Sequence, residues 1–524
     1  MPQPHSPHTE QILIPDFADW AVQACSYENT SLDELRASAR RRFVDEATRY
    51  VSRLRQVALD AGLPSDALPV PEGDTTGPLI MTGHQPSIFH PGLVFKYTQA
   101  EKFSNENQAT ALGIIIDTDI GDPGEFAFPT ATGDRDSLLD VSTGTATFSA
   151  GAGLYPDCRM HSAGDLNAQI QRVETAISGV LRPSAQHRFQ CVAAQYRQLI
   201  RASMMEANLI FRRLHGIGNR LLELPLSHFC VFPETVAVIA GILNRSHEFA
   251  ATYNRLLDEF RSDHHIRNRA NPFPDLDISE QHCELPFWVL NHSTQERLTV
   301  SVRRTGSGHE LTFGDVAGLS WQDELTPALL QDVVDGGFTL VPRGALITGL
   351  LRLLVSDLFV HGTGGGKYDV FTDRLITAWW GVRSTPFVVA SATRMLMPER
   401  TARLDHLEQL ATQLRELSHN PQRFLGSGIF TPQCEALLQD LLEEKQYTVD
   451  ALQQARAEGI SGKEIGAKLQ RLTRRIKSLV EDQFRAEMEE LEAISNESRS
   501  TLRARTWPWF FFSDPDEPSA ECRS

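Results

Sequence analysis

The sequence lacks any hydrophobic run long enough to cross a membrane. No stretch approaches the roughly 18 uninterrupted apolar residues that a spanning helix requires. The first residues, MPQPHSPHTEQILIPDF, also lack the basic start and the apolar stretch of a secretory signal. We therefore expect a cytoplasmic protein with no membrane partner.

The sequence has few cysteines and fewer basic than acidic residues. The 524 residues include only 7 cysteines, and no two of them are close in sequence. This pattern matches neither a disulfide framework nor a Cys-x-x-Cys metal site, and we predict no metal. The formal net charge of −17 would repel a phosphate backbone, so nucleic acid is not an expected partner.

Several catalytic motifs are also absent. The sequence has no HExxH, no GxSxG nucleophile elbow and no protein-kinase set. The stretch FVHGTGGGKYD (359–369) resembles a phosphate loop, but His361 and Tyr368 stand where a Walker sequence needs glycine and Ser or Thr. These absences disfavour zinc proteases, serine hydrolases, kinases and P-loop enzymes.

What the sequence does contain is the opening of an α/β fold. A short apolar strand (75–83) runs into a glycine turn, a helix (92–103) follows, and a second apolar strand (109–119) comes next. This order predicts a doubly wound sheet, whose ligands bind at the carboxyl ends of the strands. We expect the following parts: the first part of this core (1–150), a helical insertion (151–280), a small antiparallel β insertion (281–340), the second part of the core (341–400), an antiparallel coiled-coil hairpin (401–500) and a tail that packs back on the core (501–524).

The predicted hairpin carries an apolar seam. Its members recur at alternating steps of four and three, which is coiled-coil spacing. Beyond them the register shifts, because Gln483 occupies the next seam position. Self-association is the expected role of this arm, with packing of the hairpin only upon itself as the alternative. The first register comprises Ile465, Leu469, Leu472, Ile476 and Leu479, and the second comprises Val480, Phe484, Met488 and Leu491.

The first polar segment that could carry chemistry is TGHQPSIFHPG, which follows the first core strand. His84 and Gln85 would face the crevice, where an imidazole can donate, accept or shuttle a proton. His90 and Lys96 are further candidates. The structural alternative is a proline-stiffened turn, with His90 as an N-terminal helix residue and Lys96 on the surface.

The second segment, DTDIGD, places Asp117, Asp119 and Asp122 after the second strand. Carboxylates at this position could hold a ribose hydroxyl, a substrate amine or a divalent cation. Aspartates also cap helices and populate turns, which is the structural alternative.

The third segment is the glycine-rich stretch 359–369. Gly364, Gly365 and Gly366 would let the backbone approach a ligand closely, and Lys367 could neutralise an anion. His361 and Asp369 flank these glycines. Arg343 and Arg394 are candidate carboxylate binders. We expect the three segments to converge on one water-accessible hollow.

Taken in order, several stretches resemble the bacillithiol-synthase family, also called putative cysteine ligases. They are the strand ending in TG, the acidic end of the second strand, ELPFWVL (284–290), PRGALITGLLRLLVSDLFVHGTGGGKYD (342–369), the late hairpin and WPWFFF. The resemblance implies a Rossmann-like parallel-sheet core and a coiled-coil arm that mediates a homodimer. It also implies a reaction that joins the carboxyl of cysteine to the amine of glucosaminyl-malate. The cofactor stays open, with a nucleotide as one candidate.

The chain resembles a divergent member of that family. The best-known members have glutamine where His84 stands, and their second strand ends in a different acidic pattern. For amide formation, we expect His84 or Asp119 to act on the amine and Gly364, Gly365, Gly366 and Lys367 to bind the anionic partner. His361 could serve either role. The alternatives are a nucleotidyl or glycosyl transferase that uses the same crevice, and a non-catalytic dimeric scaffold.

Overall fold

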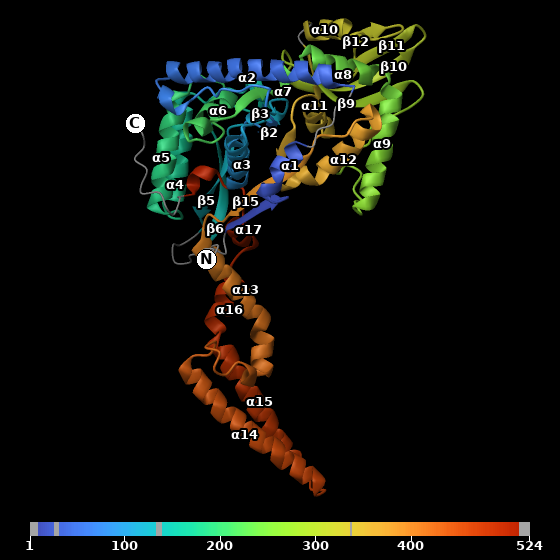
Figure 1. Ribbon diagram of the computed structural model, residues 1–524. Coiled ribbons are helices and arrows are strands. Elements are labelled where there is room, and N and C mark those ends of the chain that lie inside the picture. The colour runs from blue at the N-terminus through green and yellow to red at the C-terminus, as the bar shows by residue number, and fades with distance from the viewer. Residues whose placement is uncertain (1–8, 26–30, 133–138, 336–337, 513–524) are drawn as a thin grey trace. The chain divides into compact units, whose positions relative to one another are not determined.

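The computed structural model describes residues 9–25, 31–132, 139–335 and 338–512 (Figure 1). The chain divides into two compact units. Unit 1 contains 1–128, 144–394 and 505–524, and unit 2 contains 129–143 and 395–504. Within the described ranges, no helix is both long and apolar enough to span a bilayer.

Unit 1 is built on a mixed six-stranded sheet with the order β1-β15-β14-β2-β3-β8. The edge strand β1 pairs with β15 in the antiparallel sense, and all other neighbours are parallel. The prediction of a mixed α/β protein is therefore correct. The strands are β1 (Thr9–Ile14), β2 (Leu79–His84), β3 (Thr110–Ile115), β8 (Leu222–Pro225), β14 (Leu358–His361) and β15 (Phe387–Arg394).

The order of the strands creates a switch point between β2 and β14. From β2 the chain moves through α3 (Pro91–Asn107) to β3 on one side, and from β14 it moves through α12 (Thr363–Trp380) to β15 on the other. The connections therefore diverge above the carboxyl ends of these two strands. Such a divergence is where open α/β sheets bind ligands.

The register of β2 and β14 assigns their side chains to opposite faces. Val360 pairs with Thr82, so Thr82, His84 and Val360 share one face, whereas Gly83 and His361 share the other. The first face carries α1 (Trp20–Ala24) and α3, whose apolar residues form one cluster with Ile80 and Val360. On the second face α12 contacts β14 and β15.

The predicted helical insertion is not wholly helical in the structure. Residues 151–280 include β8, whose four residues LELP complete the central sheet. Because this strand is short and buried on both faces, its residues do not alternate between apolar and polar, and the sequence pattern did not reveal it. The α-helices of this region are α4 (Ala163–Ile177), α5 (Pro183–Gln198), α6 (Met204–Leu214), α7 (Leu226–Cys230), α8 (Pro233–Asn244) and α9 (Ser246–Asp263).

A second sheet in unit 1 is antiparallel and has the order β12-β11-β10-β9-β13. Strand β9 lies between β10 and β13, so its side chains are flanked from both sides. Helix α10 (Pro327–Asp335) precedes β13, and α11 (Ala345–Leu354) follows it. The strands are β9 (His282–Asn291), β10 (Glu296–Thr305), β11 (Gly308–Phe313), β12 (Val316–Trp321) and β13 (Phe338–Pro342).

The N-terminal helix α2 (Asp33–Asp60) and two small sheets complete the regular structure of the first third. Arg36 and Arg40 of α2 form ion pairs with Asp357, which also accepts a hydrogen bond of 2.8 Å from the Leu79 amide. These contacts tie α2 to the amino ends of β2 and β14. The small sheets pair β4 (Ile120–Gly121) with β7 (Gly153–Leu154) and β5 (Glu125–Ala131) with β6 (Val141–Thr147).

The aromatic C-terminal segment packs into unit 1. Trp507, Phe510 and Phe511 are buried, and the Trp509 amide donates a hydrogen bond of 2.9 Å to the Phe89 carbonyl. Burial of this segment removes a large apolar surface from water. Residues 513–524 of the predicted tail lie outside the described residues.

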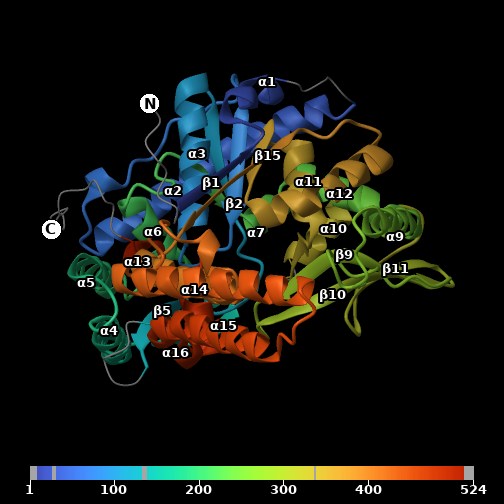
Figure 2. The same ribbon diagram turned by 90° about the horizontal axis from the view of Figure 1, so that it is seen from below.

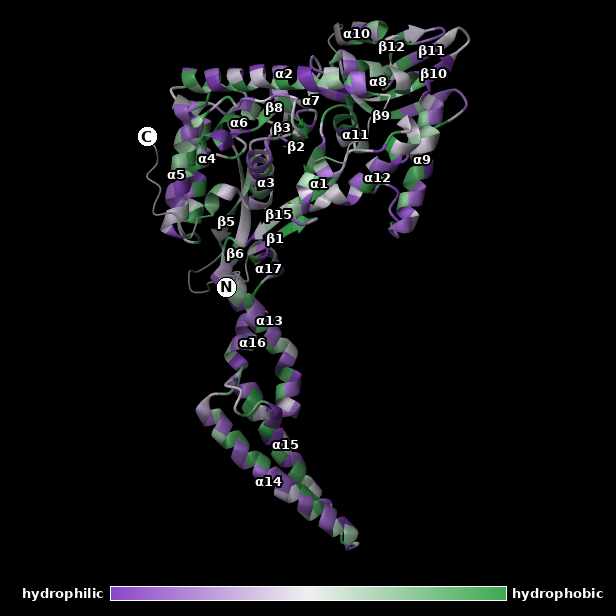
Figure 3. Cartoon of the chain, viewed as in Figure 1, coloured by the Kyte–Doolittle hydropathy of each residue, from purple (hydrophilic) through white to green (hydrophobic). Residues whose placement is uncertain are grey.

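Unit 2 contains two long helices, α14 (Pro432–Ala457) and α15 (Lys463–Gln483), which lie side by side in both views (Figures 1 and 2). Hydrophilic and hydrophobic residues are interspersed along each helix (Figure 3). Leu472, Ile476, Val480 and Phe484 are buried in their shared core. The Gln483 side chain instead donates to the Ile429 carbonyl at 3.2 Å, so the apolar register shifts at this residue. The helices of unit 2 are α13 (Pro398–His419), α14 (Pro432–Ala457), α15 (Lys463–Gln483), α16 (Arg485–Ala493) and α17 (Asn496–Leu502).

Candidate functional site

A pocket of about 240 Å³ opens beyond the carboxyl end of β3 in unit 1. Two of the predicted site residues, Asp119 and Arg343, line it. Its other walls come from the antiparallel sheet, from α9 and from the segment between α9 and β9. The lining residues are Thr118, Asp119, Tyr253, Phe273, Pro274, Trp288, Arg297, Pro342, Arg343, Gly344 and Ile347.

Asp119 is held in place by two side chains from different parts of the fold. Gln85, which follows β2, donates its amide to Asp119 Oδ2 at 3.1 Å. Arg297 of β10 forms an ion pair of 2.7 Å with Asp119 Oδ1. Of the three segments expected to converge, the first two therefore meet at Asp119, whereas no residue of the glycine-rich stretch 359–369 lines the pocket. Arg297 joins the central sheet to the antiparallel one.

Trp288 of β9 lies between the two arginines of the pocket. The guanidinium carbon of Arg297 is 4.8 Å from the ring centre, and that of Arg343 is 4.5 Å from it. Arg343 forms an ion pair with Glu284, just as Arg297 does with Asp119. These five residues form a row in the order acid, arginine, tryptophan, arginine, acid, which we call the charge row.

Sequence reasoning missed Trp288, Arg297 and Glu284 as site residues. The stretch ELPFWVL was predicted to belong to a small antiparallel β insertion, but its register and its pairing with β13 were not predicted. Trp288 pairs with Thr299 of β10 on one side and with Val341 of β13 on the other. Only this register brings the arginines of two different strand ends to the same ring.

The second polar cluster lies between α11 and α12. His361 Nε2 is 2.8 Å from Asp369 Oδ2, and both side chains are buried. Asp369 also accepts hydrogen bonds of 2.6 Å from Thr348 Oγ1 and from Arg352 Nη1. Burial opposes ionisation of Asp369, but the interactions of this carboxylate with His361, Arg352 and Thr348 outweigh it and hold the pKa of this carboxyl well below its usual range.

Asp369 therefore does not have the role predicted for it. Its oxygens are occupied by His361, Arg352 and Thr348, so it orients the imidazole instead of binding a substrate. A carboxylate at one ring nitrogen sets the tautomer and leaves the other nitrogen available. Helix α11 connects this pair to the pocket, because Ile347 lines the pocket and the next residue, Thr348, binds Asp369.

The predicted glycine loop is the first turn of a helix. Gly362 is the N-cap of α12, and Gly364, Gly365 and Gly366 lie within its first turns. Gly364, Gly365 and Lys367 are exposed, whereas Gly366 is buried. The amides of a first turn have no partners within the helix and favour anions. A Cβ on Gly365 would lie 2.7 Å from Nδ1 of His361, so glycine is needed for the imidazole to approach the turn.

His84 does not reach the cluster that contains His361 and Asp369. It lies on the opposite face of the sheet from His361, where its ring packs edge-on against Phe89 with centres 5.7 Å apart. Burial, reinforced by the positive charge of Lys96, lowers the pKa of His84 to about 3. The imidazole is therefore neutral at pH 7. The period of two along β2 sends Thr82 and His84 to the α3 face, which is why the predicted catalytic role is not supported.

His90, Asp117 and Asp122 have structural partners. His90 is the N-cap of α3, and its Nδ1 accepts a hydrogen bond of 3.1 Å from the Gly92 amide. Asp117 is buried and accepts hydrogen bonds from the amide (3.0 Å) and hydroxyl of Ser227. Asp122 Oδ1 accepts from the Gly124 amide at 2.9 Å. These three side chains therefore have capping and turn roles, and Asp119 is the one aspartate of the acidic segment that lines the pocket.

Two further predicted site residues, Arg394 and Lys96, contact other parts of the protein and do not line the pocket. Arg394, at the end of β15, lies over the Phe512 ring with its guanidinium carbon 5.3 Å from the centre. Lys96 is buried, and its ammonium donates a hydrogen bond of 2.7 Å to the Gly83 carbonyl. In the described part of the chain, His, Cys, Asp and Glu form no group of three or more that could hold a metal ion.

Lys96 should make stability depend on pH. Burial lowers the pKa of Lys96 from 10.5 to about 7, so between these values the unfolded chain binds the proton that the folded chain has released. The free energy of unfolding should therefore rise as pH increases through this window. Denaturant titrations at several pH values should show a smaller rise for Lys96→Met. The exposed Lys102 of the same helix provides the control, Lys102→Met, and an equal rise in both variants would contradict the assignment.

No family model matches the sequence, and no curated protein matches it. The pocket, the charge row and the His361–Asp369 pair are therefore the features that bear on function.

Proposed function

We propose that this protein is a ligase-like enzyme that joins the carboxyl of cysteine to the amine of an amino-sugar conjugate such as glucosaminyl-malate. The charge row beside the pocket is the observation that carries the proposal. Five strands of the central sheet run parallel, and their order creates a switch point. Both features support a Rossmann-like core, which the resemblance to bacillithiol synthases implies.

The charge row suits a zwitterion such as an amino acid. Each arginine already has an acidic partner, so the row as a whole is neutral. A bound carboxylate would face an arginine, and a bound ammonium would face Asp119 or Glu284. The apolar part of the pocket would receive the side chain. A volume of about 240 Å³ is below the range of drug-sized sites and suits a small substrate.

The His361–Asp369 pair is suited to proton transfer. Amide formation requires an amine that has lost its proton, and a positioned imidazole is the most common group that accepts one. With Nε2 bound to Asp369, Nδ1 faces the first turn of α12. His361 would therefore take the proton from the attacking amine, and Asp369 would stabilise the imidazolium that results.

The first turn of α12 fits an anionic group that supports carboxyl activation. Its N-cap is glycine with no side-chain hydrogen bond, and Gly364, Gly365 and Lys367 are exposed. A nucleotide bound there would supply the energy for ligation. The residues that would hold its phosphates are the amides of this turn and the Lys367 ammonium.

We also propose that unit 2 mediates a homodimer through a coiled coil. Helices α14 and α15 already bury one apolar seam against each other. The large apolar side chains of Leu437 and Tyr447 in α14, and of Ile460 at the turn after it, are nevertheless exposed. Such residues favour association with a second copy over a hairpin that packs only upon itself.

A direct assay tests the proposed reaction. Purified protein should convert cysteine and glucosaminyl-malate, with ATP present, to the amide that mass spectrometry detects. Asp119→Asn should weaken cysteine binding about ten-fold or more, since it removes the charged partner of a bound ammonium. Asp122→Asn, which changes a turn residue outside the pocket, is the matched control. Transfer of a nucleotidyl or sugar group without an amide product would instead support transferase activity, and absence of cysteine binding would refute the proposal.

A further inference from the structure

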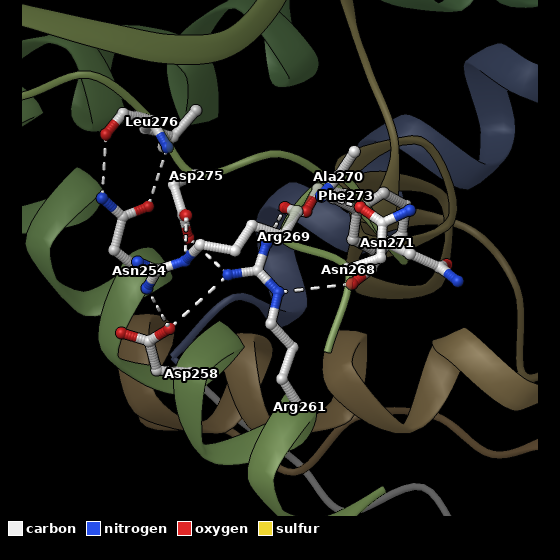
Figure 4. A network of polar contacts seen from close by, with 10 residues as sticks. All are labelled: Asn254, Asp258, Arg261, Asn268, Arg269, Ala270, Asn271, Phe273, Asp275 and Leu276. Atoms are coloured by element: carbon white, nitrogen blue, oxygen red, sulfur yellow. Dashed lines mark hydrogen bonds and ion pairs between the residues drawn. The ribbon is translucent and has the colours of Figure 1, made fainter. Parts of the chain in front are cut away.

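One wall of the pocket is an irregular segment between α9 and β9. Phe273 and Pro274 of this segment line the pocket opposite the antiparallel sheet. Figure 4 shows the segment gathered around the side chain of Arg261, which projects from α9. Because the segment has no regular structure of its own, its position depends on these side-chain contacts.

Arg261 binds the segment through all three nitrogens of its guanidinium. Nε donates to the Asn271 carbonyl at 3.2 Å, Nη2 donates to the carbonyls of Phe273 (2.7 Å) and Arg269, and Nη1 forms an ion pair of 2.6 Å with Asp275. The side chain is only 6% exposed. Arginine alone can satisfy acceptors in this fork-shaped arrangement, whereas lysine presents a single nitrogen.

The contact at Phe273 leads directly into the pocket. The Phe273 ring lies against Gly344, where a Cβ would come within 2.8 Å of Cδ1. Gly344 starts α11 with a φ of +59°, a conformation that L side chains rarely adopt. The same ring packs against Tyr368 and Phe371 of α12, at centre distances of 6.2 and 5.8 Å. Phe273 thus contacts both helices that carry the second polar cluster.

A second side chain attaches the end of the segment independently. Asn254 of α9 donates to the Leu276 carbonyl and accepts from the Leu276 amide, both at 2.9 Å. Loss of Arg261 would therefore release residues 269–275 without detaching the segment from α9 altogether. The expected consequence is a displaced pocket wall in a protein that still folds.

We propose that Arg261 is a positioning residue for the pocket, which it shapes by fixing the backbone of Phe273. The inference rests on the proposed function for the identity of the ligand, because cysteine is the probe. It does not require that Arg261 touch the ligand. Its effect should therefore appear in binding, with little effect on the chemical step.

The first test compares two substitutions on α9. Arg261→Lys should raise the KM for cysteine about ten-fold with kcat nearly unchanged, because binding energy is lost equally in the ground and transition states. Arg255→Lys alters an exposed ion pair with Glu259 on the same helix and should change neither constant. Asp275→Asn, at a side chain that is 33% exposed, should raise KM by a smaller factor and serves if Arg261→Lys fails to fold. Unchanged KM in every folded variant would overturn the proposal.

The second test uses chemical rescue. Arg261 also lines an open groove of about 650 Å³, so solvent reaches the space that Arg261→Ala would leave. Guanidinium ion at a non-denaturing concentration should restore cysteine binding to this variant and not affect Arg255→Ala. Failure of rescue in a folded variant would count against positioning by the guanidinium.

Hydrogen exchange separates failure of this inference from failure of the proposed function. If the wild-type protein binds no cysteine, the proposed function is wrong, but the role of Arg261 can still be measured. Amides at 343–347, on the far side of Phe273 from Arg261, should exchange faster in Arg261→Lys than in Arg255→Lys. Equal exchange in the two variants would refute the positioning role whatever the ligand.

Discussion

Replacing His361 with asparagine is expected to lower turnover by about 10²–10⁴-fold, the contribution of a positioned proton-transfer group. The effect should fall on kcat, because His361 is separate from the residues that line the pocket. Asp369 keeps its hydrogen bonds from Thr348 and Arg352, so the buried carboxylate still has partners and the fold is retained. Steady-state kinetics with mass-spectrometric detection of the amide would measure the loss.

Two companion variants make the result specific. Asp369→Asn keeps the size of the side chain but removes the charge that stabilises the imidazolium, so kcat should fall. His406→Asn changes an exposed histidine of α13 in unit 2 and is the matched control. Normal turnover in both His361→Asn and Asp369→Asn would show that another group transfers the proton.

Glu223→Gln is expected to lower the free energy of unfolding by about 3–5 kcal/mol, the cost of leaving a buried charge without its partner. Glu223 of β8 is fully buried and forms ion pairs with Arg212 and with Arg213, the latter at 2.9 Å. Both arginines are buried too, so a neutral amide would leave two positive charges without compensation. Gly113 of β3 makes room for the carboxylate, since a Cβ there would lie 2.6 Å from Glu223 Cγ.

Denaturant unfolding followed by tryptophan fluorescence would measure this change. The tryptophans, 7 in all, belong to unit 1, so the signal reports on the unit that contains Glu223. Glu248→Gln is the matched control, because its pair with Arg245 is exposed on both sides and should contribute little to stability. Equal midpoints for the two variants would mean that the buried arginines find other compensation.

Much of the fold could be predicted because it depends on local pattern. The apolar runs that became β2 and β3, with a glycine turn and a helix between them, are visible in a few consecutive residues. Asp119 was found by the same reasoning, since polar residues at the end of a buried strand stand where α/β sheets bind ligands. The shift of the seam to Val480 and Phe484 was likewise visible in the spacing of apolar residues.

The site was harder to predict because its members come from strands that are distant in sequence. Arg297 is 178 residues from Asp119, and no local pattern connects them. The glycines of the third segment were recognised as unusual, but a run of glycine is a poor helix former and was interpreted as a loop. Their place in the first turn of α12 follows from the strand that ends at His361 and from the packing of Gly366 against Val389.

Composition and short-range periodicity were sufficient to indicate an α/β protein, the ends of its first two parallel strands and one carboxylate of the pocket. Tertiary structure alone decided which polar side chains meet. Neighbouring strands pair in one register, and side chains alternate between the faces of a sheet, so a single position separates a residue that faces the pocket from one that is enclosed behind it. This is why His84 and His361, on adjacent strands, face opposite ways, and why Trp288 lies between two arginines that the chain order keeps far apart.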